Sequence, residues 1–169
     1  MTAASIPHST SHEGRRATFA ALFLFSLILG FVGALAVQLP NVRLHQLGVP
    51  GAAIGFSTAL QALGIVIGAM LVVVTRARAG SAAIISLGGA VASLSLLALG
   101  NPMDIAGVSA WRFAMAIGTG AILTTAEYVL IARAAAGWRA TAVAAFATFG
   151  IAGHAFAPAF IGLAGPDSE

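Results

Sequence analysis

The sequence predicts an all-α fold, a polytopic membrane helix bundle with five transmembrane helices. Of its 169 residues, 59% are hydrophobic and only 8% are charged, and the mean hydropathy is +0.99. Water-soluble domains keep about a quarter of their residues charged, so this chain lacks the polar surface that would cover a core in water. The lipid bilayer is therefore its expected solvent and its first expected partner.

Five apolar stretches supply the expected helices. Each approaches or reaches the ~20 residues that a helix needs to cross ~30 Å of hydrocarbon. In lipid every backbone N–H and C=O group must be satisfied within the segment, which favours helices over strands. Short connections make consecutive helices antiparallel and place them in one domain, a transmembrane bundle over residues 17–163. The expected spans are 17–39, 53–74, 81–100, 109–132 and 140–163.

The segments outside the spans are short and polar. Residues 1–16 are expected to form a disordered cytoplasmic tail, and residues 164–169 an external tail. Arg15 and Arg16 precede an apolar run that contains Ala34-Leu35-Ala36, so a cleaved signal peptide is one interpretation of the first span. Because the run is longer than the usual signal core of about 7–15 residues, a signal anchor fits better.

The arginines predict the orientation, because cytoplasmic segments of membrane proteins carry an excess of Arg and Lys. With the N-terminus inside, only Arg43 and Arg112 fall on the outer side. The inner segments then hold the six topology charges Arg15, Arg16, Arg76, Arg78, Arg133 and Arg139. The expected location is the plasma (cytoplasmic or inner) membrane, with the N-terminus cytoplasmic and the C-terminus external. Arginines dispersed between apolar runs do not make a nucleic-acid-binding surface.

Small residues mark the helix faces that are expected to pack, since helices in lipid associate through close backbone approach. The second span carries Gln61, Gly64 and Gly68 on one face. The fifth span has four such residues at a spacing of four: Gly150, His154, Pro158 and Gly162. Helix packing is the simplest interpretation of the glycines.

Glu127 lies deep in the fourth span, about 9 Å of helical rise from Arg133. A charge near the middle of the bilayer costs about 2.5–3.5 kcal/mol on insertion scales, so this carboxylate is expected to face a partner helix or a watery cavity. Helical spacing places it on a mostly small or polar stripe with Arg112, Ala116, Thr119 and Leu123. Two interpretations stay open, a proton or substrate site and a protonated packing residue.

Arg112 and His154 are the other ionisable candidates within the spans. Arg112 lies beside Trp111 near the outer end, where an arginine can snorkel to the interface. It is about 22 Å from Glu127 along the helix, too far for a direct ion pair. His154 near the midplane either joins a proton relay or bonds to a neighbouring polar group.

Metal, cofactor and enzyme chemistry are not expected. The chain contains no cysteine, and its other histidines lie outside the spans, so no metal-ligand cluster is visible. Glu127 and His154 are roughly 12 Å apart in depth, which gives poor support to a catalytic site.

Near its start, the fourth span contains R-F-A-M-A-I-G-T-G, from Arg112 to Gly120. This segment resembles the R-x-x-x-G-x-G-x-G pattern of major facilitator superfamily (MFS) transporters. Gly118 and Gly120 occupy two of its glycine positions, and Ala116 replaces the first glycine. The resemblance runs over nearly all of residues 17–163 and assigns Arg112 to proton coupling.

Two further segments bear on the resemblance. The fifth span is similar to the glycine-proline motif of the family's proton-driven antiporters in Gly150, Gly153 and Pro158, with Ala157 where glycine is usual. Proline removes a backbone hydrogen bond and permits a bend, which suits gating. The loop T-R-A-R-A-G that begins at Thr75 departs from the family's G-x-x-x-D-R-x-G-R-R, because it lacks the aspartate.

The resemblance implies the first five of the twelve helices of the family fold. In its complete form such a transporter would export an unknown small molecule by proton-coupled antiport. This chain would be a truncated or split part that pairs with a second transporter half or with another copy. The alternative is a non-transporting membrane scaffold that binds other helices, or a decayed transporter remnant.

Overall fold

The computed structural model describes residues 12–101 and 103–163, and within these ranges the chain is helical, without a β-strand. The elements are α1 (His12–Gln46), α2 (Gly51–Thr75), α3 (Ser81–Leu99), α4 (Ile105–Arg133), the 3-10 turn η1 (Ala136–Trp138) and α5 (Arg139–Leu163). All five α-helices are long and apolar enough to cross a membrane. The predicted all-α class is confirmed, and the five long apolar helices are those expected of an integral membrane protein.

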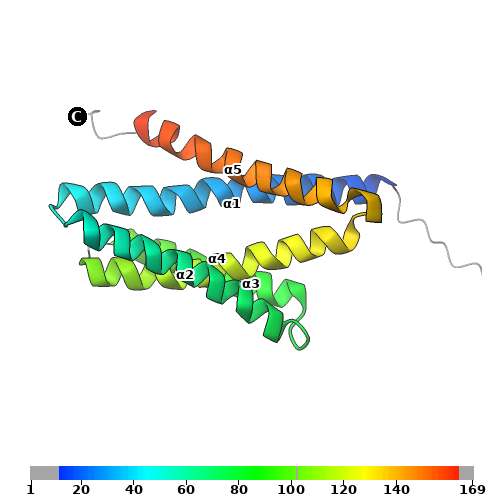
Figure 1. Cartoon of the computed structure of the whole chain (residues 1–169), viewed down its shortest axis with the longest axis horizontal. Coiled ribbons are helices and arrows are strands. Elements are labelled where there is room, and N and C mark those ends of the chain that lie inside the picture. The colour runs from blue at the N-terminus through cyan, green and yellow to red at the C-terminus, as the bar shows by residue number, and fades with distance from the viewer. Residues whose placement is uncertain (1–11, 102, 164–169) are drawn as a thin grey trace, which may run out of the picture.

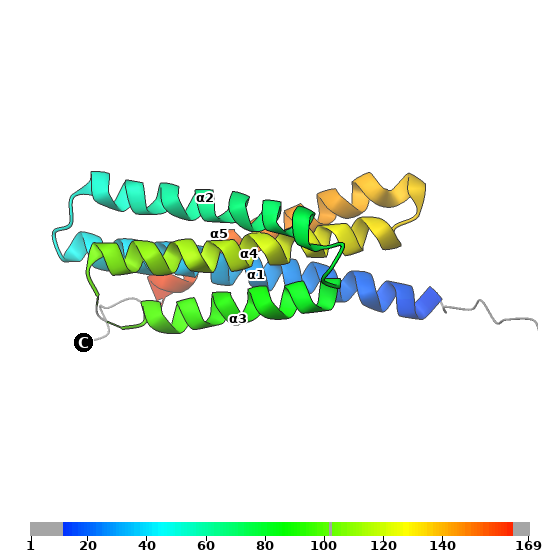
Figure 2. The ribbon, with the colours of Figure 1, turned by 90° about the horizontal axis from the view of Figure 1, so that it is seen from below.

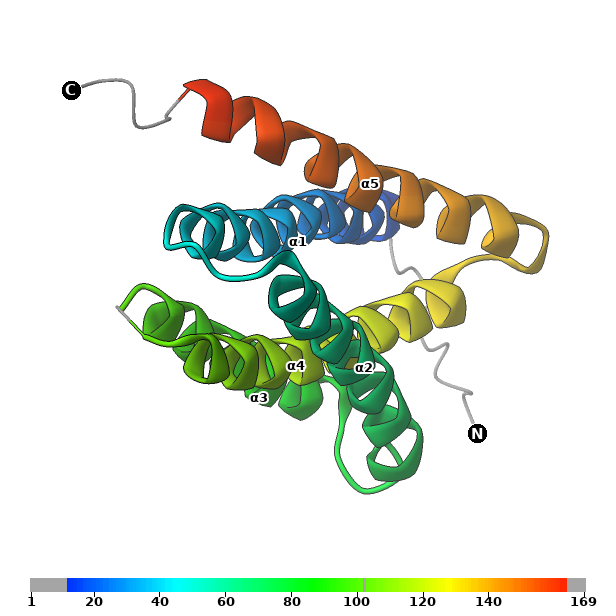
Figure 3. The ribbon, with the colours of Figure 1, turned by 60° about the vertical axis from the view of Figure 1, so that its left-hand side comes forward.

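Consecutive helices run antiparallel along the long axis of the molecule (Figures 1 and 2). The most extensive contacts join α2 to α4, α5 to α1, and α3 to α4. Figure 3 shows the resulting division into an α1–α5 pair and a group formed by α2, α3 and α4. The C-terminal part of α4 joins the two, through the buried cluster Ala126, Leu130, Ala134, Ala142 and Phe146.

The largest difference from the predicted spans is in α1. Residues 12–16 are helical, so the prediction that they belong to a disordered tail is wrong; residues 1–11 and 164–169 lie outside the described part of the chain. The helix also continues through Pro40 to Gln46, beyond the predicted end at residue 39. A proline ring holds φ near the helical value and removes only its own N–H donor. The helix therefore continues beyond the apolar segment from which its end was predicted.

Local hydrogen bonds fix the end of α1 and the start of α4. Gly48 has φ +75°, a left-handed conformation that favours glycine, and the Val49 N–H donates to the Leu44 carbonyl at 3.0 Å. Both features belong to the Schellman motif of helix C-termini. At the N-cap of α4, the Asp104 carboxylate accepts a hydrogen bond from the Gly107 N–H at 2.8 Å. This cap explains why α4 begins four residues before the predicted position 109.

Glycines allow backbones to meet on two faces of α4. A Cβ atom at Gly68 would overlap the Ile117 carbonyl, and one at Gly120 would overlap the Ile65 carbonyl, both at the α2–α4 contact. At the α3–α4 contact, a Cβ at Gly88 would lie 2.9 Å from the Gly118 carbonyl oxygen. Gln61, Gly64 and Gly68, which the sequence places on one face of the second span, are all buried.

The packing face of α5 differs from the predicted row of residues spaced by four. Gly153 contacts the Leu27 carbonyl of α1 and Gly150 lies against Ser26, but Pro158 is exposed and Gly162 has open space around it. Each step of four residues advances about 40° around a helix. A long row at this spacing therefore turns away from the contact between α5 and α1. The buried positions are instead Ala142, Phe146, Gly153 and Ala157, whose steps of four, seven and four residues keep them on one face, because a step of seven turns back about 20°.

Neighbouring glycines in α3 offer a matched test of backbone packing. Gly88→Leu forces a side chain against the Gly118 carbonyl, whereas Gly89 has nothing within 4 Å of its Cβ position. We expect Gly88→Leu to lower the free energy of unfolding in detergent by about 1–3 kcal/mol, the usual cost of overpacking. Gly89→Leu should unfold like the parent chain. Equal unfolding of the two variants would contradict the α3–α4 contact.

Candidate functional site

Arg112 of α4 is fully buried, with 0% of its surface exposed, and its guanidinium is held by two neighbouring helices, α1 and α2. Its Nε donates to Gln61 Oε1 of α2 at 3.1 Å. Its terminal nitrogens donate to Asn41 Oδ1 at 2.9 Å, Ser57 Oγ at 3.3 Å and the Val37 carbonyl at 3.3 Å. The snorkelling interpretation is therefore wrong: the side chain turns into the bundle because four oxygens there replace its contacts with water.

Two pairs of residues, each one helical turn apart, form this cage. Ser57 and Gln61 belong to the buried face of α2 that continues into its glycines, and the close α2–α4 approach brings them to Arg112. Asn41 follows Pro40 in α1 and lies one turn after Val37. The four oxygens are all neutral, so the cage satisfies the donors of Arg112 without neutralising its charge.

A cavity of about 580 Å³ lies between α1, α2, α4 and α5. Its wall is mostly apolar, and its polar side chains are Ser26, Gln61, Thr119, Glu127 and His154. Glu127 and His154 are both exposed residues, so each presents a titratable group to this space. The structure thus brings two of the predicted site residues, from α4 and α5, to one cavity. Their role in proton coupling stays a prediction.

Gln61 connects the cavity to the buried arginine, because it lines the cavity and accepts a hydrogen bond from Arg112. Arg112 and Glu127 make no ion pair, as expected from their separation along α4. Arg112, Glu127 and His154 therefore lie around the same cavity and the adjoining cage, without direct contact between them. The permanent positive charge of Arg112 lies behind Gln61 and raises the electrostatic potential in the cavity. A more positive potential favours anionic groups in the cavity.

Most of the predicted topology charges gather at one end of the bundle, where α1 and α5 begin and α2 and α4 end (Figure 1). The Arg76 guanidinium lies 3.0 Å from the centroid of the Tyr128 ring, a cation–π contact between α2 and α4. Arg133 Nη1 donates to Thr18 Oγ1 at 3.4 Å. Both arginines therefore also tie helices together.

Several residues of the site are absent from the sequence-based candidates. Asn41, Ser57 and the Val37 carbonyl complete the Arg112 cage, and Ser26 of α1 donates to the Phe146 carbonyl of α5 at 2.7 Å. Ser26 and Ser57 could have been identified from the sequence, because each is a polar residue within an apolar segment. No comparable signal marks a carbonyl group, because every residue has one.

The chain matches no protein-family model, no curated protein and no solved structure. Among the described residues, no group of three or more His, Cys, Asp or Glu side chains could hold a metal ion. The functional interpretation therefore depends on the Arg112 cage and on the cavity that contains Glu127 and His154.

The cage can be tested by removing one acceptor. Gln61→Leu leaves a buried donor of Arg112 without its partner, and we expect a loss of about 1–3 kcal/mol in unfolding free energy. Gln46→Leu makes the same chemical change at an exposed position and should have little effect in the same detergent denaturation assay. Adding Arg112→Met to Gln61→Leu should recover part of the loss; a purely additive loss would show that the two side chains are not coupled.

Proposed function

We propose that this chain is part of a proton-coupled transporter of the MFS type, which exports a small molecule in its complete form. The observation that carries the proposal is the cavity between the membrane-crossing helices, with one carboxylate and one imidazole in its wall. Intramembrane ionisable residues face cavities or partners and commonly form proton pathways. The buried Arg112 and the R-F-A-M-A-I-G-T-G segment are the second line of support.

In the proposed mechanism, Glu127 and His154 exchange protons with water or substrate in the cavity. Gln61 turns its amide oxygen toward Arg112 and thereby separates the permanent charge from the titrating groups. Alternating access in such transporters rocks one helical unit against another around a site near the midplane. The cavity walls contributed by α1, α4 and α5 would face the partner unit, a second half or another copy.

The scaffold alternative depends on glycine-rich faces that are free to bind other helices. Gly64, Gly68, Gly118 and Gly120 instead lie in contacts between α4 and its neighbours α2 and α3. Gly150 and Gly153 lie against α1. Because these faces are occupied within the bundle, they give little support to a scaffold, and the transporter proposal accounts better for the ionisable cavity.

Proton exchange can be measured on this chain itself. In lipid nanodiscs, infrared difference spectra between neutral and acidic pH should contain a carboxyl band that Glu127→Gln removes. Asp104→Asn changes a carboxylate at the N-cap of α4, outside the cavity, and should leave that band in place. A Glu127→Gln spectrum identical to that of the parent chain would refute the proton-carrying role.

Transport itself requires the complete assembly, for which an adjoining coding sequence with about seven further spans is the expected source. In that assembly, Glu127→Gln and Arg112→Ala should each abolish proton-driven efflux of the substrate. Unchanged efflux in both variants would reduce these residues to packing roles.

We further propose that the arginine-rich end is cytoplasmic and that the membrane is the plasma membrane, following the positive-inside rule. The absence of cysteine permits a direct test with single cysteines in intact cells. An impermeant thiol reagent should label Leu47→Cys, in the α1–α2 turn, but label Ala77→Cys only after the cells are opened. The reverse pattern would invert the topology.

A further inference from the structure

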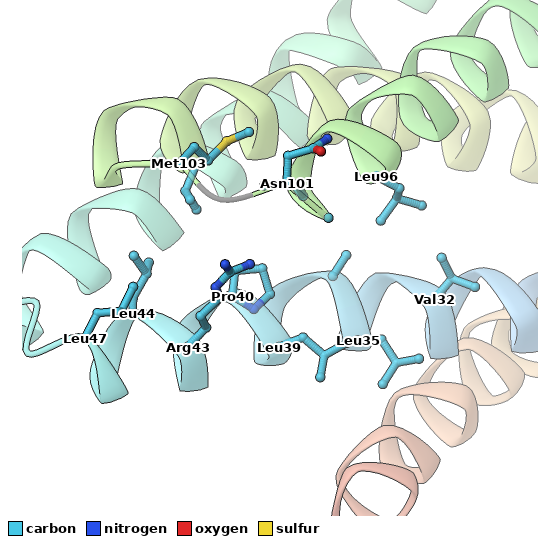
Figure 4. Close-up of a pocket in the computed structure, with 14 residues that line it drawn as sticks. Val32, Leu35, Leu39, Pro40, Arg43, Leu44, Leu47, Leu96, Asn101 and Met103 are labelled. Carbon is cyan, nitrogen blue, oxygen red and sulfur yellow. The ribbon is translucent and has the colours of Figure 1, made fainter. Parts of the chain in front are cut away.

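A second cavity, separate from the ionisable one, lies between the C-terminal part of α1 and the end of α3. Its volume is about 400 Å³, within the about 300–1,000 Å³ typical of ligand sites. Figure 4 shows α1 side chains on one side and Leu96, Asn101 and Met103 on the other. Val32, Leu35 and Leu39 extend the α1 wall along two turns. The space is therefore a lateral groove with apolar helical walls.

One end of this groove carries the Arg43 cation, which has no side-chain partner within the part of the chain that the structure describes. Arg43 lines the groove and rises from α1 into the space that faces Asn101 (Figure 4). No side-chain hydrogen bond or ion pair of Arg43 occurs with the described residues. Opposite Arg43, the polar side chain among the described lining residues is Asn101, which donates its amide N–H to the Leu97 carbonyl at 3.2 Å. The polar end of the groove thus suits an anion.

The length of α1 allows Arg43 to reach the level of lipid headgroups. The 35 residues of α1 span about 52 Å, much more than the ~30 Å hydrocarbon core. Arg43 lies in the last turn of this helix, and the excess length lets that turn reach past the hydrocarbon to the lipid headgroups. An amphipathic ligand at this place would hold its charged group beside Arg43 and its chain along the leucines.

The groove walls favour an acyl chain over another helix. Each extensive helix contact in this molecule contains glycine: Gly68 and Gly120 for α2–α4, Gly88 for α3–α4, Gly30 and Gly153 for α1–α5. Helix association in lipid depends on such small residues. The groove instead presents branched side chains along α1, where Ala36 is the small exception. Flexible chains fill irregular surfaces of this kind, whereas a helix backbone could not approach closely.

We propose that this groove binds an anionic phospholipid, with its phosphate at Arg43 and one acyl chain along the wall formed by α1 and α3. The site is independent of the proposed transport function, because it shares no ionisable residue with the other cavity. A bound lipid would fasten α1 to α3, which otherwise belong to different halves of the bundle.

The test compares lipid retention by the purified full chain in native mass spectrometry. Phosphatidylglycerol and phosphatidylcholine with identical acyl chains serve as probes. We expect about fivefold preference for phosphatidylglycerol, which corresponds to the ~1 kcal/mol that one basic side chain contributes at an anionic lipid surface. Arg43→Gln should abolish the preference. Arg78→Gln removes another exposed arginine, at the opposite end of the bundle, and should retain it.

A second pair of variants tests the chain-binding wall. Leu99→Trp fills the groove, whereas Leu97 is 72% exposed and does not line it. We expect Leu99→Trp to reduce retention of both lipids and Leu97→Trp to leave it unchanged. Two results would overturn the proposal. One is equal phosphatidylglycerol retention by Arg43→Gln and the parent chain; the other is a disulfide-linked dimer of Leu39→Cys in membranes, which would identify a second copy as the occupant.

Discussion

The close approach of α4 to two neighbouring helices is the constraint on which the rest of the structure depends. Gly120 and Gly68 bring α4 and α2 to backbone contact, while Gly118 and Gly88 do the same for α4 and α3. Helices in lipid gain little from hydrophobic burial, because the solvent is as apolar as the side chains. Dispersion at short range and interhelical hydrogen bonds must then hold the bundle together, and both require that the backbones lie close.

The Arg112 cage is a consequence of that approach. Ser57 and Gln61 reach the guanidinium only because the next two turns of α2 carry glycine at the contact with α4. The other side of the cage belongs to α1, which makes few contacts with α2 and α4. Hydrogen bonds to a charged group contribute more than those between neutral groups, about 1.5–3 kcal/mol each. Arg112 therefore joins the α1–α5 pair to the α2–α3–α4 group.

The two cavities differ in chemistry, and the difference follows from their position along the bundle. The larger one lies beside the middle of α4 and α5 and contains a carboxylate, an imidazole and an amide. The lateral groove lies near the end of α1, and among the described residues that line it Arg43 carries the charge. Titratable groups within the hydrocarbon depth suit proton exchange, while a cation at the boundary suits a lipid headgroup. Separate chemistries can therefore coexist in a small chain.

The sequence alone determined the helical class, the five long apolar segments and the clustering of arginines at one end, because hydropathy and helix length are local properties. It also marked Arg112, Glu127 and His154 as unusual, since charge within an apolar segment is visible without a fold. Only the tertiary structure decided which faces of the helices meet. These helices are apolar on nearly every side, so periodicity does not reveal their rotation, and the row that contains Pro158 and Gly162 was misplaced for this reason. The partners of Arg112 lie 51 to 75 residues away along the chain, and no local pattern specifies such a contact.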